Sequence, residues 1–231
     1  MKKNLLLLLL IVCSAMFAQD KPKFGVNLGA TYSNVRTNNF NDQIVSFKDS
    51  KYDVNFLVGV SIEIPLNEKF SFVGNINYER KSYKRNAVFS QSSFEDFDPI
   101  LDNRTYVSEE YKTRLEYITV PLNLKYYIDS EKKFYANGGP FLGFFFNSNY
   151  KTDGKNSGDG NDNFKTLDFG VNLGVGTNFK INDKSSLNLE IRHNYGLIDI
   201  NKIESTPTFT AFVSYVKTNS FNLIANYQFD L

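Results

Sequence analysis

Polar and apolar residues alternate through most of the chain downstream of Lys23. In the segment LDFGVNLGVGTNFKI, residues 167–181, apolar side chains take almost every second position, and Gly, Asn, Asp and Lys stand between them. A period of two is that of a β-strand with two unlike faces. No segment keeps a convincing helical period, so the pattern predicts an all-β protein.

The alternation recurs about eight times, and the connections between the repeats alternate in length. Strands are expected at residues 24–34, 53–64, 70–81, 113–128, 134–147, 165–180, 185–198 and 219–231. Tight connections at 65–69, 129–133 and 181–184 alternate with much longer ones. Outer-membrane barrels have short periplasmic turns and longer extracellular loops. The rhythm therefore predicts an eight-stranded antiparallel up-and-down transmembrane β-barrel with short periplasmic turns and long extracellular loops.

The polar face of the predicted strands favours a membrane barrel over a soluble one. A soluble barrel or sandwich needs abundant charge on its outer face. Here the polar face is poor in charge and rich in Gly, Asn, Ser and Thr, which suits a narrow, hydrated lumen. The apolar face, for example between Val54 and Ile64, would then contact lipid, and Tyr and Phe near the strand ends would form interfacial girdles. Soluble lipocalin-like binding is the alternative, and carbonate washing of membranes distinguishes the two.

The same alternation directs six charged side chains into the predicted lumen. They are Glu63, Glu79, Lys125, Asp168, Glu190 and Arg192. Opposite charges inside a barrel can pair across strands and close it, whereas ionisable groups within a membrane segment can also mark an ion path or substrate site. In so narrow a barrel we favour a structural plug. The alternative is a small-solute or ion channel.

The start of the chain predicts export. MKKNLLLLLLIVCSAMFAQ opens with two lysines, continues with an apolar run and reaches small residues before Gln19. These are the features of a secretory signal peptide, so we expect residues 1–18 to be cleaved and 19–231 to form the barrel in the outer membrane. An uncleaved anchor is one alternative, although a spanning helix needs about 20 apolar residues. A lipid-modified Cys13 is another.

The composition argues against nucleic-acid binding and against cysteine chemistry. The formal net charge of +1 over 231 residues gives no sign of a nucleic-acid surface. Cys13 is the only cysteine and lies in the segment expected to be removed. The mature chain would then have no disulfide, no thiol nucleophile and no cysteine zinc site. The expected partner is outer-membrane lipid.

Four segments in order resemble the PorT-like outer-membrane β-barrel family. They are RLEYITVPLNLKYYI (114–128), FYANGGPFLGFFF (134–146), DFGVNLGVGTNFKI (168–181) and LNLEIRHNYGLIDI (187–200). The resemblance covers nearly all of the mature chain and implies an eight-stranded outer-membrane barrel without catalytic residues to carry over. The family takes its name from a protein-export component, so a place in an export complex is a further alternative. The C-terminal NYQFDL departs from the usual terminal aromatic residue.

Two features of the sequence bear on catalysis and metal binding. His193 is the only histidine, and its parity places it on the lipid face, so we expect neither catalysis nor a cofactor there. Asp153, Asp159 and Asp162 lie among Gly and Asn in 152–163. Calcium takes oxygen ligands from such loops, but the order of an EF-hand is missing and a solvated extracellular loop is favoured.

The long connections are the expected contact regions. The loop 82–112 carries several Phe and Tyr residues, which can bind a protein partner or fold over the barrel mouth. The loop 148–164 is the second candidate. Together these observations predict a non-enzymatic outer-membrane barrel with a structural or interaction role.

Overall fold

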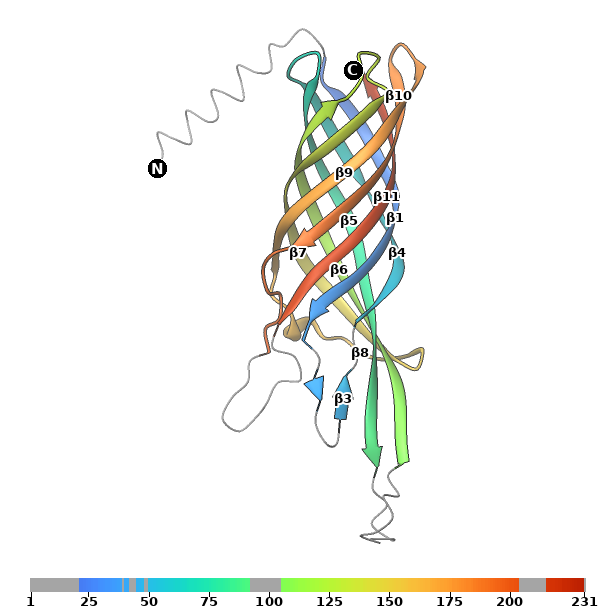
Figure 1. Cartoon of the computed structure of the whole chain (residues 1–231), viewed down its shortest axis with the longest axis vertical. Helices are drawn as coiled ribbons and strands as arrows, with labels where there is room; N and C mark the ends of the chain where they lie inside the picture. Colours follow the sequence, from blue (N-terminus) through green and yellow to red (C-terminus); the bar gives the residue numbers. More distant parts are fainter. Residues whose placement is uncertain are drawn as a thin grey trace, which may run out of the picture.

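The computed structural model describes residues 21–38, 40–41, 45–47, 50–91, 105–203 and 215–230. Within these residues, eight long antiparallel strands form a closed ring (Figure 1). They are β1 (Lys23–Thr37), β4 (Lys51–Pro65), β5 (Phe70–Gln91), β6 (Thr105–Tyr127), β7 (Phe134–Thr152), β9 (Leu167–Asn182), β10 (Ser185–Gly196) and β11 (Val216–Asp230). The ring closes because β1 pairs with β4 on one side and with β11 on the other. The predicted eight-stranded barrel is confirmed.

Short elements lie at one end of the barrel. They are β2 (Phe40–Asn41), β3 (Val45–Phe47), β8 (Lys155–Gly158) and the 3₁₀ helix η1 (Asn161–Asn163). In the part of the chain that the structure describes, no helix has the length and apolar character needed to cross a membrane.

The three tight turns lie at the opposite end, where β1 begins and β11 ends (Figure 1). Each holds its geometry with a short polar side chain. Asn67 Oδ1 accepts hydrogen bonds from the backbone N–H groups of Lys69 and Phe70, both at 2.9 Å. Asp129 and Asn182 accept comparable bonds in the other two turns. Asn and Asp favour turns because their side chains bond to the backbone a few residues further on, so these connections are specified locally.

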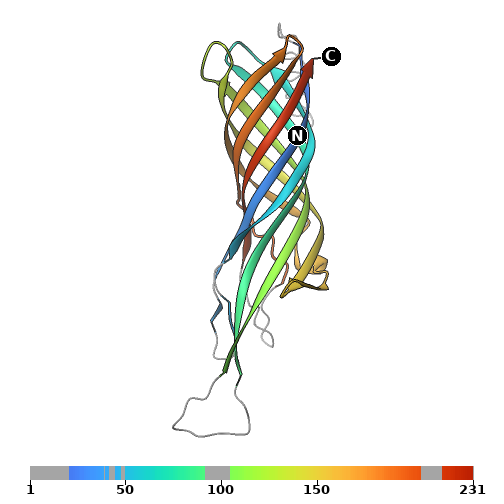
Figure 2. The same cartoon turned by 90° about the vertical axis from the view of Figure 1, so that its right-hand side faces the viewer.

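Strands cover 82–91 and 105–112 of the expected loop 82–112, so the loop prediction was wrong there, and residues 92–104 lie outside the described residues. β5 and β6 continue as a paired hairpin from Ser82 opposite Arg114 to Gln91 opposite Thr105. Figure 2 shows this ribbon extending well beyond the barrel. The sequence pattern missed it because SYKRNAVFSQ, residues 82–91, does not alternate apolar and polar residues, although Arg85 and Ala87 are buried.

The expected loop 148–164 is also more ordered than predicted. β7 continues to Thr152, and the chain then reverses at Asp153 and Gly154, whose φ angles are +46° and +79°. It returns as β8, which pairs with β7. Glycine reaches positive φ without steric cost, so the DG pair in this segment encodes a hairpin.

The two faces of the strands point as the alternation predicted. Apolar side chains on the outer face are widely exposed, with Leu173 at 71% and Leu28 at 64%. Asn, Ser and Thr on the inner face are buried, and Asn27 and Asn123 are at most 2% exposed. An apolar outside and polar inside is the arrangement of a barrel surrounded by lipid.

The interior is filled by matching large residues with glycine across neighbouring strands. On β7 and β9, Tyr135 lies opposite Gly176 and Phe141 lies opposite Gly170. A Cβ atom on Gly176 would lie 2.4 Å from the Tyr135 ring. Small barrels have barely enough interior for side chains, so these glycines make room for aromatic rings and leave no open bore here.

Candidate functional site

Glu63 on β4 is the centre of a buried polar cluster near the short-turn end. Its carboxylate accepts hydrogen bonds from Lys125 Nζ at 2.9 Å, Tyr127 Oη at 2.5 Å and Gln228 Nε2 at 3.0 Å. The lysine Nζ also lies 4.1 Å from the centroid of the Tyr135 ring. Donors from β6 and β11 therefore reach a β4 carboxylate, and they connect three strands across the barrel. Such charge-assisted bonds are stronger than neutral ones.

Glu190 and Arg192 on β10 form a second buried pair. Arg192 Nε donates to Glu190 Oε1 at 2.6 Å. The other carboxylate oxygen accepts from Asn137 Nδ2 at 2.8 Å and Tyr135 Oη at 3.2 Å. The two side chains are neighbours on one strand face because residues i and i+2 point the same way. Partners on β7, on the far side of the intervening strand β9, hold this pair in place.

Asp168 on β9 forms the third cluster, with a cation that the sequence analysis did not select. Lys81 Nζ lies 3.4 Å from Asp168 Oδ2, and Thr218 Oγ1 donates to the same oxygen at 2.7 Å. The lysine Nζ also lies 5.0 Å and 5.1 Å from the ring centroids of Tyr117 and Phe141. Its side chain is 4% exposed, so this lysine is held inside by a carboxylate and two aromatic faces.

Glu79 takes neutral partners. Its Oε1 accepts from Asn222 Nδ2 at 3.1 Å and from Ser220 Oγ at 3.4 Å, both on β11. Among the described residues, no ion pair joins Glu79 to Arg192. The six charged residues therefore all lie inside the barrel, but they form separate clusters.

Asparagine amides fill the space between the charged clusters. Asn27 Nδ2 donates to Asn75 Oδ1 at 3.0 Å and to Asn77 Oδ1 at 2.8 Å, whereas Asn27 Oδ1 accepts from Asn226 Nδ2 at 2.6 Å. Asn226 Oδ1 in turn accepts from Asn188 at 3.2 Å. An amide both donates and accepts, so this chain of bonds crosses β10, β11, β1 and β5 without needing charge.

Little free volume is left among these side chains. The cavity between the Glu63 and Glu190 clusters measures 20 Å³, which is room for about one water molecule.

Apolar side chains occupy the interior at the end opposite the short turns. Leu115, Tyr117 and Phe145 point inward from β6 and β7, and Phe164 and Ile200 pack against them from the connections. Val35 and Val216 complete this apolar cluster. The alternation predicted a polar lumen throughout. This end differs because the chain folds over the mouth and excludes water from it, so apolar side chains are favoured there.

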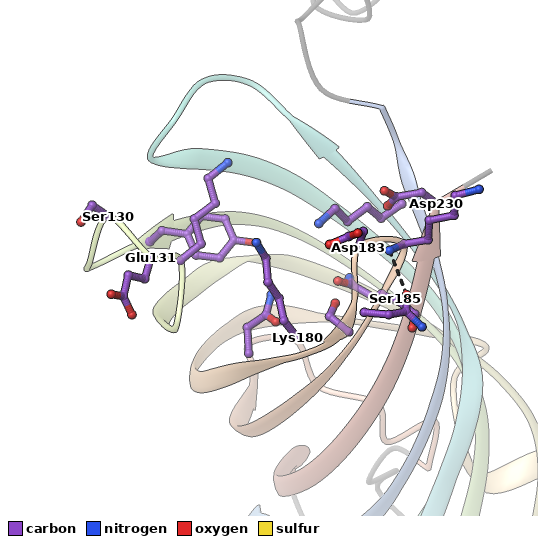
Figure 3. A pocket seen from close by; sticks show the side chains of 14 residues that line it. Ser130, Glu131, Lys180, Asp183, Ser185 and Asp230 are labelled. Atoms are coloured by element: carbon purple, nitrogen blue, oxygen red, sulfur yellow. Dashed lines mark hydrogen bonds between the residues drawn. The ribbon is translucent and has the colours of Figure 1, made fainter.

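The short-turn end is open by comparison. A cavity of 330 Å³ lies between the turns (Figure 3). Lys180, Asp183, Ser185 and Asp230 are among its lining residues. Tyr127 and Gln228 also line this cavity, so the Glu63 cluster closes its floor.

Sequence comparison identifies the family of this barrel. The family described as outer membrane protein beta-barrel domain matches residues 17–202. The chain belongs to this family. It is an integral protein of the outer membrane, and its exposed apolar face is the surface that contacts lipid.

Solved structures with similar folds include several outer-membrane barrels. Neisserial surface protein A has 13% identity and a TM-score of 0.43, with 90% of this chain and 97% of that chain covered. OprG from Pseudomonas aeruginosa has 12% identity and a TM-score of 0.41, with 91% and 97% covered. The outer membrane protease OmpT from Escherichia coli has 11% identity and a TM-score of 0.39, with 93% and 98% covered. These likenesses carry no inference about activity. A search of curated proteins gave no match.

His193 lies on the outer face of this outer-membrane barrel, as its parity predicted. Its ring stacks on Phe221 at a centroid distance of 4.3 Å, and Nε2 lies 2.7 Å from Asn219 Oδ1. Both contacts are on the neighbouring strand β11. The ring is thus part of the aromatic surface near the end of the barrel from which the β5–β6 hairpin extends, which we call the long-hairpin end.

Two aspartates of 152–163, Asp153 and Asp162, lie in a turn and in the 3₁₀ helix η1. Asp153 takes a turn conformation, and its Oδ1 accepts from the backbone N–H of Glu110 at 3.1 Å. Asp162 lies in η1. Throughout the described ranges, no group of three or more His, Cys, Asp or Glu residues is placed to hold a metal ion.

Several interior residues that complete the clusters were not among the predicted site residues. Lys81 stood at the end of an expected strand, although it shares parity with Glu79. Tyr127 and Tyr135 lie near the ends of expected strands and were not among the predicted lumen residues. Both point inward and are at most 4% exposed. Strict parity counted from Lys125 and Asn137 would have found them.

Proposed function

We propose that this outer-membrane barrel is a closed, non-conducting protein with a structural or interaction role. The observation that carries the proposal is the filled interior. A water-sized cavity of 20 Å³ separates two buried ion pairs, and an apolar cluster closes the far end. A water-filled pore needs a continuous polar path, which this packing does not provide.

The physical cost of opening such an interior also supports a plug. Each buried carboxylate has a cation or several donors within hydrogen-bonding distance. Separating a buried pair leaves an uncompensated charge, which typically costs about 3–5 kcal/mol. Moving these side chains aside to admit an ion would require a free energy of this size at each cluster. A small-solute channel is therefore the weaker alternative.

The interaction role would belong to the long-hairpin end. The β5–β6 hairpin extends beyond the barrel (Figure 2) and offers a surface for a protein partner. The resemblance to PorT-like proteins suggests an accessory component of a protein-export complex. We further propose that the protein is not an enzyme, that residues 1–18 form a cleaved signal peptide, and that the long hairpins face the cell exterior.

Planar-bilayer recording of the purified barrel tests the proposal. We expect no unitary conductance in the wild-type protein and none in Ile191→Leu, which changes only the lipid-facing surface. Conductance that responds to Glu190→Gln or Arg192→Gln would replace the plug with a channel. Pull-down from detergent-solubilised outer membrane, with the full chain and with a variant that lacks residues 92–104, tests for a protein partner that binds the segment between β5 and β6.

A further inference from the structure

The strand register places four lysines in one row across four neighbouring strands. Lys51 on β4 pairs with Lys84 on β5, which pairs with Lys112 on β6, which pairs with Lys151 on β7. Directly paired residues lie on the same side of a sheet, and neighbouring strands are about 4.8 Å apart. The row is therefore about 14 Å long. We refer to it as the lysine row.

Like charges directly opposite one another are destabilising, so anions beside the row would stabilise it. Two of its members have them: Lys84 Nζ lies 3.0 Å from Glu110 Oε1, and Lys112 Nζ lies 2.5 Å from Asp53 Oδ2. Lys51 and Lys151, at the two ends, have no ion pair among the described residues. The chain itself therefore neutralises only the middle of the row.

Further cationic charge lies between the lysine row and the exposed apolar outer face of the barrel, which we refer to as the apolar belt. Arg114 is two residues from Lys112 on the same strand, opposite Asn149, and has no ion pair in the described part of the chain. The next row pairs Arg80 with Glu116 at 2.9 Å. Counting Arg80, Arg114 and the lysine row against Asp53, Glu110 and Glu116 leaves a formal surplus of three positive charges.

The same strands lead directly into the lipid-contacting surface. Tyr78 on β5 lies 5.8 Å from Phe56 and 5.9 Å from Phe146, measured between ring centroids. Lys84 is six residues further along β5, which is about 20 Å along the strand and about 14 Å along the barrel axis at a tilt near 45°. A simple phospholipid phosphate at the interface is too close to the belt to reach the lysine row. A glycolipid with a phosphorylated saccharide headgroup reaches it while its acyl chains lie on the belt.

We propose that the lysine row and Arg114 bind the phosphorylated headgroup of an outer-leaflet glycolipid, on the outer face of β4 to β7. The site rests on the proposed outward orientation of the long hairpins. It does not depend on whether the interior conducts.

Binding to the barrel in phosphatidylcholine nanodiscs tests the site. The probes are fluorescent lipopolysaccharide with a phosphorylated core and the same lipopolysaccharide after enzymatic dephosphorylation. Lys51→Gln/Lys151→Gln removes the two lysines without ion pairs and leaves Asp53 and Glu110 paired. A basic residue near an anionic surface contributes about 1 kcal/mol, so we expect an apparent Kd roughly 30-fold higher. Lys180→Gln/Lys184→Gln removes two exposed lysines at the short-turn end and should stay within about twofold of wild type.

Several outcomes overturn the proposal. Equal affinity for the dephosphorylated lipopolysaccharide would show that phosphate is not recognised. An unchanged Kd in Lys51→Gln/Lys151→Gln, with folding verified by heat-modifiable gel migration, would remove the lysine row. Tighter binding of a soluble sulfated polysaccharide would reassign the patch to a soluble polyanion. Conductance of the same samples reports separately on the closed interior, so the two proposals fail independently.

Discussion

Phe141 on β7 lies directly opposite Gly170 on β9, and a Cβ atom on Gly170 would approach the ring carbon Cε1 to 2.5 Å. The same Cβ atom would lie 2.3 Å from the backbone oxygen of Tyr195. The ring is 1% exposed and has no solvent to move into. The close packing of this wall of the barrel therefore depends on the absence of a side chain at Gly170.

We expect Gly170→Ala to destabilise the barrel by about 1–3 kcal/mol, the usual cost of overpacking. Gly74→Ala is the matched control, because its nearest neighbour would be Ile62 Cγ2 at 3.6 Å, an ordinary contact. Urea unfolding in detergent micelles, followed by heat-modifiable gel migration, measures both. If the two variants unfold at the same urea concentration, the packing argument is wrong.

Arg192→Leu should weaken the barrel more than any lipid-facing swap on the same strand. The substitution leaves Glu190 buried without its cation, and breaking such a pair typically costs about 3–5 kcal/mol. Ile191→Leu keeps the volume and should cost under about 1.5 kcal/mol. The unfolding temperature on gels compares them. Equal unfolding temperatures together with altered ion conductance would favour a channel.

Lys81 and Asp168 should show strong energetic coupling. Lys81→Met keeps the aliphatic contact with the Tyr117 and Phe141 rings but leaves the Asp168 carboxylate with Thr218 alone. Asp168→Asn removes the charge that would be stranded. We therefore expect the double variant to be more stable than Lys81→Met, with a coupling energy of about 0.5–3 kcal/mol in a double-mutant cycle. Additive effects would mean that the two side chains do not interact.

The two rims should differ in exposure to the cell exterior. Ser157 in β8 and Asn67 in the β4–β5 turn are both exposed and lie at opposite ends of the barrel. A cysteine at Ser157 should react with an impermeant maleimide on intact cells, whereas one at Asn67 should react only after lysis. Labelling at Asn67 alone would invert the topology.

Acid should weaken the β6–β7 turn through Asp129. Hydrogen bonds from the backbone N–H groups of Phe134 and Lys133 lower the pKa of its carboxyl below the ordinary value. A carboxyl with a lowered folded-state pKa stabilises the fold above its unfolded-state pKa, and this contribution disappears as the pH falls through the folded-state pKa. Asp129→Asn does not titrate. The stability difference between wild type and Asp129→Asn should therefore shrink as the pH falls below about 3.9. A difference independent of pH would contradict this role.

The sequence alone determined the architecture, because a barrel with lipid outside and polar side chains inside imposes a period of two on every strand. The alternation predicted that His193 lies on the outer face and that the six charged residues lie on the inner face. The tight turns followed from residues such as Asn67, whose side chains bond to the nearby backbone. The partners of those charges needed the tertiary structure, because the shift between strands decides which residues meet. Closure of the ring joined Lys81 to Asp168 and placed Glu79 beside Ser220 and Asn222 of β11, and strand pairing aligned the four lysines of the lysine row. No local pattern encodes a contact between residues 87 positions apart, because its geometry exists only when the ring closes.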